Sequence, residues 1–208
     1  VYPQLRPLLG AQLERVIVAA YSDYINPSTD LRMPEVVSAP RQPIADQGVT
    51  LWVDALAAAR TPGPLTTGPD DLCVIPYSSG TTGRPKGCML SHRNVMHTLL
   101  SNAFWFGGNS DTSQLVVLPF FHVTSMQGGM NAPMYYGGTI VLMCRWDREV
   151  AAELIQRYKL MSWTAISTMV VDFLANPRLN EYDLSSLVRV SGGGAAMPAA
   201  VAERLQQL

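Results

Sequence analysis

Residues 77–87, with the sequence Tyr-Ser-Ser-Gly-Thr-Thr-Gly-Arg-Pro-Lys-Gly, concentrate the residue types that bind phosphate. The hydroxyl-bearing and glycine residues between the tyrosine and the arginine are Ser78, Ser79, Gly80, Thr81, Thr82 and Gly83. Glycines permit positive φ and a close approach of the backbone, so consecutive N–H groups can form a concavity that binds anions. The hydroxyls add neutral donors, and Lys86 adds a point charge suited to phosphate. The segment therefore predicts a phosphate-binding loop.

The spacing within this loop differs from two common nucleotide-binding patterns. Walker A has four residues between its first glycine and a Gly-Lys pair that is followed by Ser or Thr. Here only Thr81 and Thr82 separate the first two glycines, and Pro85 precedes the lysine. The dinucleotide pattern Gly-x-Gly-x-x-Gly is not matched either. A flexible Gly/Ser linker is the alternative interpretation, but the apolar runs 72–75 and 88–90 on either side favour a structured loop.

The loop resembles the phosphate loop of the AMP-forming acyl-activating enzymes, which include acyl-CoA synthetases, adenylation domains of peptide synthetases and luciferases. The resemblance extends over about residues 16–208 and is tightest at 72–123 and 188–198. It implies an enzyme in which a carboxylate attacks the α-phosphorus of ATP, giving an acyl-adenylate and pyrophosphate, after which CoA displaces AMP. It also implies that residues 78–86 bind the β- and γ-phosphates, with Lys86 as a catalytic residue. ATP, Mg²⁺ and CoA are the implied cofactors and co-substrates.

A second candidate is His122, which follows the sequence Leu-Pro-Phe-Phe of residues 118–121. An isolated histidine of this kind is more often a core residue whose ring nitrogens are satisfied. The acyl-activating family has a Pro-x-x-His segment here, which implies that His122 lies at the acyl pocket as a carboxylate-proximal or gating residue. We therefore count it among the catalytic candidates. A role as general base is disfavoured because the attacking carboxylate is already ionised at neutral pH.

A third candidate is the glycine-rich turn of residues 190–198, Val-Ser-Gly-Gly-Gly-Ala-Ala-Met-Pro. Glycines at a strand end allow a planar ligand to lie against the backbone, although a tight strand-to-helix turn is the plainer interpretation. In the family this segment borders adenine and the acyl group, which implies nucleotide-binding roles for Gly192, Gly193, Gly194 and Ala195. The sequence departs from the family pattern by an extra glycine and by Ala-Met in place of Pro-Leu. The variant resembles acyl-CoA synthetases that act on fatty acids, so a fatty acid is the expected substrate.

The composition excludes several classes of protein. The net charge is -1 and charged residues make up 15% of the 208 residues, so we expect no basic surface for nucleic acid or an anionic membrane. Hydrophobic residues reach 48%, yet no apolar run approaches the ~18 residues of a transmembrane helix. The cysteines Cys73, Cys88 and Cys144 are widely spaced and lack a Cys-x-x-Cys pair, which favours free thiols in a reducing cytoplasm.

The order of apolar and amphipathic segments predicts an α/β fold. Buried strands are expected at residues 16–19 and 114–119, and further strands at 139–143, 161–165 and 188–191. Helices are expected at 54–60, after the N-cap residue Ser91, at 127–136, 148–158 and 168–174, and from Pro198 onward. Continuous apolar strands that alternate with helices favour an αβα layered fold whose mostly parallel sheet is covered on both faces. Ligands bind at the carboxyl ends of such strands, so we expect His122 and Gly193 to share a cavity that faces Thr81.

Residues 1–208 are expected to form a partial AMP-binding domain of a longer enzyme. The resemblance implies later segments that this sequence lacks: a magnesium-binding glutamate, a ribose-binding aspartate and a C-terminal domain with a catalytic lysine. We therefore expect no metal ligands here, no turnover by the fragment alone, and a tendency to form a homodimer or aggregate. Two alternatives remain open. One is a peptide-synthetase-type adenylation domain, disfavoured because no acidic residue follows His122 up to Gln127, and the other is a nucleotide-binding module without catalysis.

Overall fold

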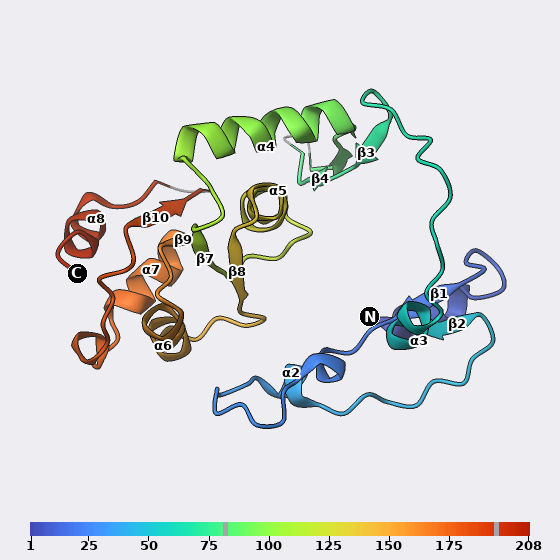
Figure 1. The fold of residues 1–208 in the computed structure, drawn as a ribbon, viewed down its shortest axis with the longest axis horizontal. Helices are drawn as coiled ribbons and strands as arrows, with labels where there is room; N and C mark the ends of the chain where they lie inside the picture. The colour runs from blue at the N-terminus through green and yellow to red at the C-terminus, as the bar shows by residue number, and fades with distance from the viewer. Residues whose placement is uncertain (81–82, 194–195) are drawn as a thin grey trace. The chain divides into compact units, whose positions relative to one another are not determined.

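The computed structural model describes residues 1–80, 83–193 and 196–208, so the predicted site residues Thr81, Thr82, Gly194 and Ala195 lie outside the described residues. The chain divides into two compact units, Val1–Leu65 and Thr66–Leu208, and each is described by itself. Figure 1 labels their helices and strands. Within the described ranges, no helix has both the length and the apolar character needed to span a bilayer.

The first unit is built on two short parallel strands. β1 (Val16–Val18) pairs with β2 (Val49–Leu51). The helical turns around them are α1 (Tyr2–Leu5), η1 (Arg6–Leu8), η2 (Tyr21–Tyr24), α2 (Glu35–Ser38) and α3 (Trp52–Ala57). The strand predicted at 16–19 forms, but its predicted burial is wrong, because Ile17 is 58% exposed. Arg6 donates two hydrogen bonds to Asp46, at 2.8 and 3.0 Å, and so links the start of this unit to the segment just before β2.

The second unit contains a four-stranded parallel sheet with the strand order β10-β9-β7-β8. Its strands are β7 (Ser113–Val116), β8 (Thr139–Leu142), β9 (Ser162–Ala165) and β10 (Arg189–Gly192). The helices of the unit are α4 (His92–Phe106), the π-helix η3 (Ser125–Asn131), α5 (Ala132–Tyr136), α6 (Arg148–Tyr158), α7 (Ser167–Leu174), η4 (Leu179–Glu181) and α8 (Ala199–Leu205). This arrangement confirms the predicted α/β class, and α6 has the predicted bounds.

One face of the sheet is apolar and carries the core of the unit. Leu115 and Trp163 lie opposite each other on β7 and β9, and both are fully buried. The Trp163 ring stacks on Trp146 with centroids 5.2 Å apart and contacts Phe173 of α7 at 5.3 Å. α6 packs on the same region, with Ile155 fully buried. This face supplies most of the hydrophobic stabilisation of the unit.

The opposite face of the sheet is polar, which corrects the expectation of continuous apolar strands. β9 reads Ser-Trp-Thr-Ala and β10 reads Arg-Val-Ser-Gly, so their side chains alternate between the two faces. The polar face carries Gln114, Ser162, Thr164, Arg189 and Ser191. Helix η3 covers it, since the Gln114 amide donates to the carbonyl oxygens of residues 128 and 129 at 3.0 and 3.2 Å. Helices thus cover both faces, as predicted, but only one face is apolar.

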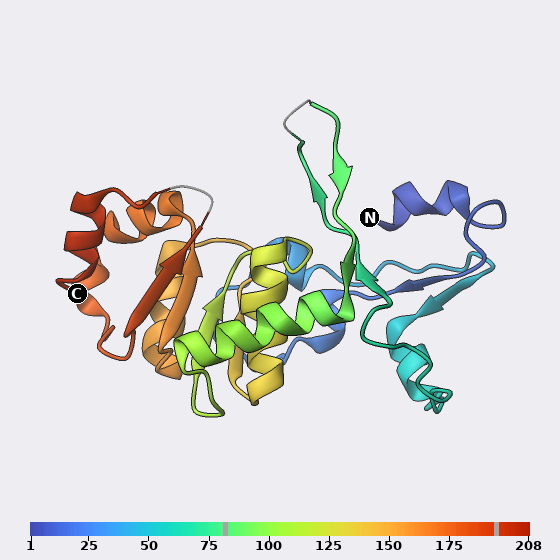
Figure 2. The same ribbon diagram turned by 90° about the horizontal axis from the view of Figure 1, so that it is seen from above.

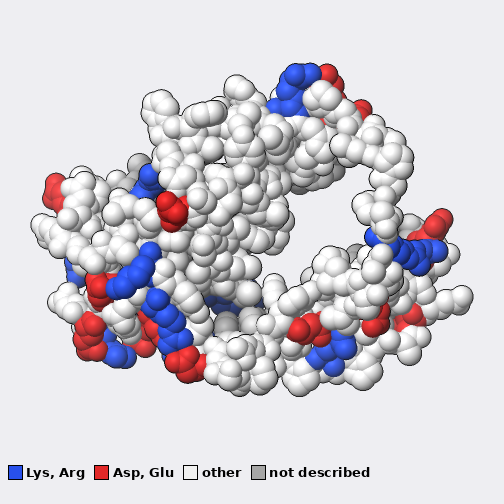
Figure 3. Space-filling model, viewed as in Figure 1, with Lys and Arg blue, Asp and Glu red and all other residues white. Residues whose placement is uncertain are grey.

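Charged side chains of both signs are interspersed on the face of the molecule that Figure 3 shows. The ion pairs of the second unit include Lys159 with Asp183 at 2.6 Å and Arg157 with Glu153 at 2.9 Å. No large area of positive charge appears in this view. The distribution agrees with the net charge of -1.

Candidate functional site

The predicted phosphate-binding loop forms the tip of a hairpin. β4 (Tyr77–Ser78) and β5 (Lys86–Gly87) are antiparallel, with Ser78 opposite Lys86. Figure 2 shows the hairpin as an arm that projects beyond the end of α4. Ser79 and Gly83 lie in the tip and are exposed. The hairpin register therefore brings Lys86 back beside the first serine of the loop, which the sequence alone did not predict.

Gly80 has a conformation that only glycine adopts without strain. Its φ is +69°, and a Cβ atom built on it would collide with the carbonyl oxygen of Arg84. Gly83 also has a positive φ, of +81°, but a Cβ there would meet no described atom within 4 Å. The backbone thus turns back on itself at Gly80, which supports the predicted requirement for glycine in an anion-binding turn.

The base of the hairpin is fixed directly to the start of α4. β3 (Leu72–Val74) pairs with β6 (Leu90–Ser91), and Ser91 is also the N-cap of α4, as predicted. Arg93 in the first turn of α4 donates two hydrogen bonds to Asp70, at 2.8 and 2.9 Å. These hydrogen bonds lower the pKa of the Asp70 carboxyl below its ordinary value. The base of the hairpin is therefore attached to the first turn of α4, although this exposed ion pair adds little stability by itself.

Lys86 is exposed on β5 and has no ion pair with any residue in the described ranges. Its ammonium group is available to an anionic ligand at the hairpin. The acidic residues nearest to Lys86 in sequence, Asp70 and Asp71, precede β3 and have other partners. Asp70 accepts from Arg93, and Asp71 accepts from the Gly68 N–H at 2.6 Å.

His122 lies in the turn between β7 and η3 and is exposed. Its Nδ1 accepts a hydrogen bond from the Thr124 N–H at 3.3 Å, and its carbonyl oxygen accepts from the Met126 N–H at 2.9 Å. The imidazole is therefore held at the start of the helical segment with Nε2 directed away from this contact. This position excludes the alternative of a buried core histidine.

The glycine-rich turn begins at the carboxyl end of β10. A Cβ atom on Gly192 would lie 2.8 Å from the carbonyl oxygen of Ala165, so the ends of β9 and β10 require glycine here. A Cβ atom on Gly193 would meet no described atom within 4 Å. Gly192 lines a cavity with Ser167 and Met197, and Lys86, His122 and Gly193 are not part of its described lining. The predicted cavity shared by His122 and Gly193 stays a prediction, and the residue that it was to face, Thr81, lies outside the described residues.

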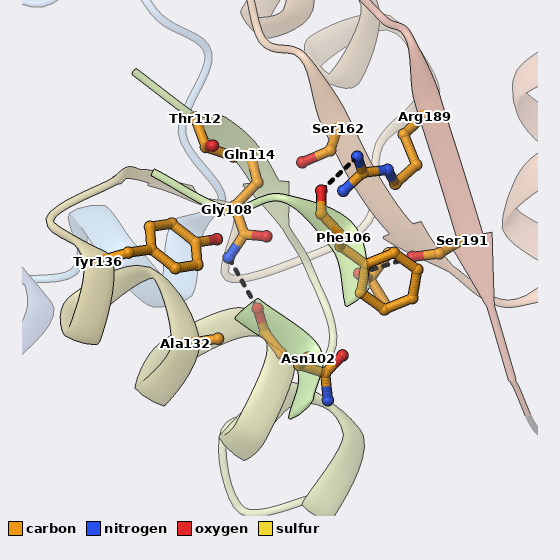
Figure 4. A pocket seen from close by; sticks show the side chains of 12 residues that line it. Asn102, Phe106, Gly108, Thr112, Gln114, Ala132, Tyr136, Ser162, Arg189 and Ser191 are labelled. Atoms are coloured by element: carbon orange, nitrogen blue, oxygen red, sulfur yellow. Dashed lines mark hydrogen bonds between the residues drawn. The ribbon is translucent and has the colours of Figure 1, made fainter. Parts of the chain in front are cut away.

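A cavity that the sequence did not predict lies between the polar face of the sheet and α4, η3 and α5 (Figure 4). Its volume is about 70 Å³, and its polar lining includes Asn102, Thr112, Gln114, Tyr136, Ser162 and Arg189. Burial raises the pKa of the Tyr136 phenol, and the positive charge of Arg189 partly offsets this increase. Ser162 and Thr164 alternate with apolar residues along β9, and Arg189 and Ser191 do so along β10. This alternation was the sequence signal for the polar face, but the apolar residues between them led to the interpretation of continuous apolar strands.

The described residues contain no group of three His, Cys, Asp or Glu side chains that could hold a metal ion. They therefore do not fit a Mg²⁺ site of their own, and no step of the chemistry below is assigned to a metal bound here.

Comparisons with known proteins identify the family. The family model described as "AMP-binding enzyme" matches residues 11–208. The chain is 32% identical to 4-coumarate--CoA ligase 3 of Oryza sativa over 157 residues (74% of this chain, 28% of the relative) and 31% identical to the long-chain-fatty-acid--CoA ligase of Bacillus subtilis over 140 residues (66% and 25%). Its fold is similar to the N-terminal domain of FACL13 from Mycobacterium tuberculosis, solved with an inhibitor bound. The TM-score is 0.69 at 28% identity, covering 92% of this chain and 47% of that one.

The chain thus spans roughly a quarter of the length of these curated relatives. The family match covers both the hairpin with Lys86 and the glycine-rich end of β10. Because it extends over nearly the whole sequence, the chain belongs to the AMP-binding enzyme family.

Proposed function

We propose that residues 1–208 are part of a longer acid–thiol ligase, called the parent ligase below. In the proposed reaction a carboxylate oxygen of the acid forms a bond to the α-phosphorus of ATP, and pyrophosphate leaves. The CoA sulfur then bonds to the acyl carbon, and AMP leaves with the electron pair of the broken C–O bond. The observation that carries the proposal is the hairpin with Gly80 and with Lys86, which has no ion pair among the described residues, in a chain that the AMP-binding family model matches.

The chain's own residues would position phosphates and neutralise their charge. The N–H groups of the turn at Gly80 and the hydroxyls of Ser78 and Ser79 are the proposed donors to the β- and γ-phosphates. Lys86 would stabilise the negative charge that builds up on the departing pyrophosphate, which is an electrostatic contribution to the transition state. Thr81, Thr82 and Gly83 complete the proposed loop. Residues 192–195, from the last residue of β10 onward, are the proposed border of adenine.

His122 is proposed to lie beside the carboxylate of the acid. It is exposed in the turn between β7 and η3, and its Nδ1 accepts a hydrogen bond from the Thr124 N–H, which leaves Nε2 to meet a ligand. A donor placed beside the acid would orient it for attack on ATP, and such positioning contributes to the rate without any proton transfer. Both a fatty acid and an aromatic acid such as coumarate are named by the relatives, and the fatty acid is the class that the glycine-rich turn favours.

The reducing cytosol is the proposed location. Cys73 and Cys88 are exposed free thiols, and Cys144 is also free. Exposed thiols that are not paired favour a compartment in which thiols stay reduced.

The proposed function predicts pyrophosphate exchange into ATP that depends on a carboxylic acid. The parent ligase should catalyse this exchange and form AMP when CoA is added. The isolated 208-residue chain should do neither, because its described residues supply no metal site. Exchange assays with radiolabelled pyrophosphate and a panel of aliphatic and aromatic acids measure this directly. Absence of exchange with every acid would refute the proposal.

Size-exclusion chromatography of the same isolated chain tests the homodimer that we propose for it. β10 is an edge strand, and Val188 beside it is 71% exposed. An open strand edge pairs readily with another chain. A monomer at all protein concentrations would contradict this part of the proposal.

Substitution of Gly80 by alanine is expected to slow exchange roughly tenfold or more, because the added methyl group collides with the Arg84 carbonyl and the positive φ is strained. Gly83→Ala is the matched control. It has the same sign of φ but no described neighbour within 4 Å, so its effect should stay within about threefold, the cost of the left-handed conformation alone. Equal effects of the two substitutions on the exchange rate would show that the backbone turn at Gly80 is not required.

A further inference from the structure

Arg189 supplies the positive charge in the cavity between the polar sheet face and α4, η3 and α5. Figure 4 shows its guanidinium directed at the carbonyl oxygen of Phe106, to which Nη2 donates at 2.8 Å. The guanidinium also lies over the Phe106 ring, 5.2 Å from the centroid. No Asp or Glu lines this cavity, and Arg189 has no ion pair with a carboxylate in the described part of the chain.

Other polar groups around Arg189 can help to coordinate an anion. The Tyr136 hydroxyl can donate a hydrogen bond, and the Asn102 amide keeps one N–H after its donation within α4 at 3.3 Å. The Ser162 hydroxyl already donates to a backbone carbonyl oxygen of β7 at 3.3 Å. A guanidinium has five N–H donors in a fork that matches a carboxylate, and the hydrogen bond to Phe106 uses one of them. The cavity thus offers unused donors, and its described lining contains no negative partner.

This cavity adjoins the segment that was proposed above to lie beside the acid and the strand that leads to the proposed border of adenine. Gly128 of η3, the helix that follows His122, lines it, and so does Ser191, which precedes the glycine-rich turn on β10. A strand advances about 3.3 Å per residue, so Arg189 lies about 13 Å before Gly193 along β10. An acid whose reacting carboxylate lies at the carboxyl edge of the sheet would extend its far end along β10 toward Arg189.

We propose that Arg189 selects acids that carry a second carboxylate at the far end of the molecule, so that the substrate class of the parent ligase narrows from fatty acids in general to aliphatic dicarboxylic acids. This inference rests on the proposed function. A distal carboxylate would accept charge-assisted hydrogen bonds from the guanidinium, which are stronger than hydrogen bonds between neutral groups. The hydrocarbon end of a plain fatty acid would instead cover the Arg189 guanidinium and deprive its unused N–H groups of water without replacing those hydrogen bonds, which is unfavourable.

A purely structural role of Arg189 makes a different prediction. The hydrogen bond to Phe106 attaches β10 to the last residue of α4, and loss of that attachment would affect all substrates equally. Selection by charge would instead change the ratio of kcat/KM for a diacid to kcat/KM for a monoacid. Comparison of a monoacid with a diacid of the same chain length therefore separates the two roles.

The experiment measures acid-dependent pyrophosphate exchange by the parent ligase with pairs of straight-chain acids of equal length, such as octanoic and octanedioic acid, over a range of lengths. For at least one length, kcat/KM for the diacid should exceed that for the monoacid about tenfold, the factor that corresponds to about 1.4 kcal/mol. Arg189→Met should abolish this preference, mainly by raising KM for the diacid. Arg189→Lys should retain part of it, and Arg145→Met, at an exposed arginine elsewhere in the unit, should leave it unchanged.

The outcomes separate failure of this inference from failure of the proposed function. Exchange with monoacids but not with diacids, or equal kcat/KM for both at every length, would overturn the inference and leave the ligase assignment intact. Exchange with no acid of any class would overturn both. Circular dichroism spectra of the variants show whether they fold, and if Arg189→Met does not, the ratio measured on the unaltered ligase decides the question.

Discussion

Replacement of Lys86 by alanine in the parent ligase is expected to slow pyrophosphate exchange roughly 10²-fold, the usual effect of removing one group that stabilises charge in a transition state. Lys86 is exposed on β5, faces Ser78 across the hairpin, and has no ion pair among the residues in the described ranges. Its charge would matter most while negative charge builds up on pyrophosphate. KM for the acid should therefore change little, since the lysine lies on a different element from the proposed acid site.

The sequence offers one matched control, because Lys159 is its only other lysine. Lys159 is the C-cap residue of α6 and forms an ion pair with Asp183 at 2.6 Å. Lys159→Ala removes the same side chain without touching the hairpin and should leave the exchange rate within about twofold, since an exposed ion pair contributes little. If Lys86→Ala exchanged as fast as the unaltered ligase, the hairpin would have no part in the mechanism.

The second large effect concerns stability. Trp163→Ala is expected to lower the free energy of unfolding by about 3–5 kcal/mol, the range for truncation of a buried aromatic residue. Trp163 is fully buried on the apolar sheet face and contacts both Trp146 and Phe173. Its removal opens a cavity at the point where β9, α7 and the Trp146 ring meet.

Urea unfolding of the parent ligase, followed by circular dichroism, measures this change. Trp105→Ala is the control, because Trp105 on α4 is 84% exposed and surface substitutions usually change stability by less than about 0.5 kcal/mol. Trp163→Phe should cost less than Trp163→Ala, since it keeps an aromatic ring and removes a buried indole N–H for which the described structure provides no acceptor. Equal losses for Trp163→Ala and Trp105→Ala would contradict the assignment of this face as the core.

The sequence predicted where helices begin and end better than it predicted which face of the sheet is apolar and which is polar. The bounds of α6 and the N-cap of α4 follow from local signals: Asp147 accepts hydrogen bonds from the N–H groups of Glu149 and Val150, and Ser91 accepts from that of Asn94. The division of β9 and β10 into an apolar and a polar face depends on which helix covers which side. Ser162 and Arg189 become neighbours only through the parallel pairing of strands that are far apart in the sequence, and no local pattern contains that information.

The candidate site was predicted in parts. The residue types at 78–86 and the glycines from residue 192 onward led to the prediction of where a nucleotide binds, which stays a prediction. The hairpin register that places Lys86 opposite Ser78 is a result of long-range pairing, as is the cavity around Arg189. The steric need for glycine at position 192 likewise arises only when β10 approaches the Ala165 carbonyl on β9.

The junction of the hairpin with α4 has a structural consequence. Ser91 is both the last residue of β6 and the N-cap of α4, so no linker separates the base of the hairpin from the helix. The ion pair between Arg93 and Asp70 links the first turn of α4 to the segment before β3. α4 has 15 residues, which makes it a strut about 22 Å long. Its far end is Phe106, whose carbonyl oxygen is tied to Arg189. The two ends of α4 therefore lie at the base of the hairpin and at the wall of the Arg189 cavity, so that one continuous helix connects the two proposed binding regions.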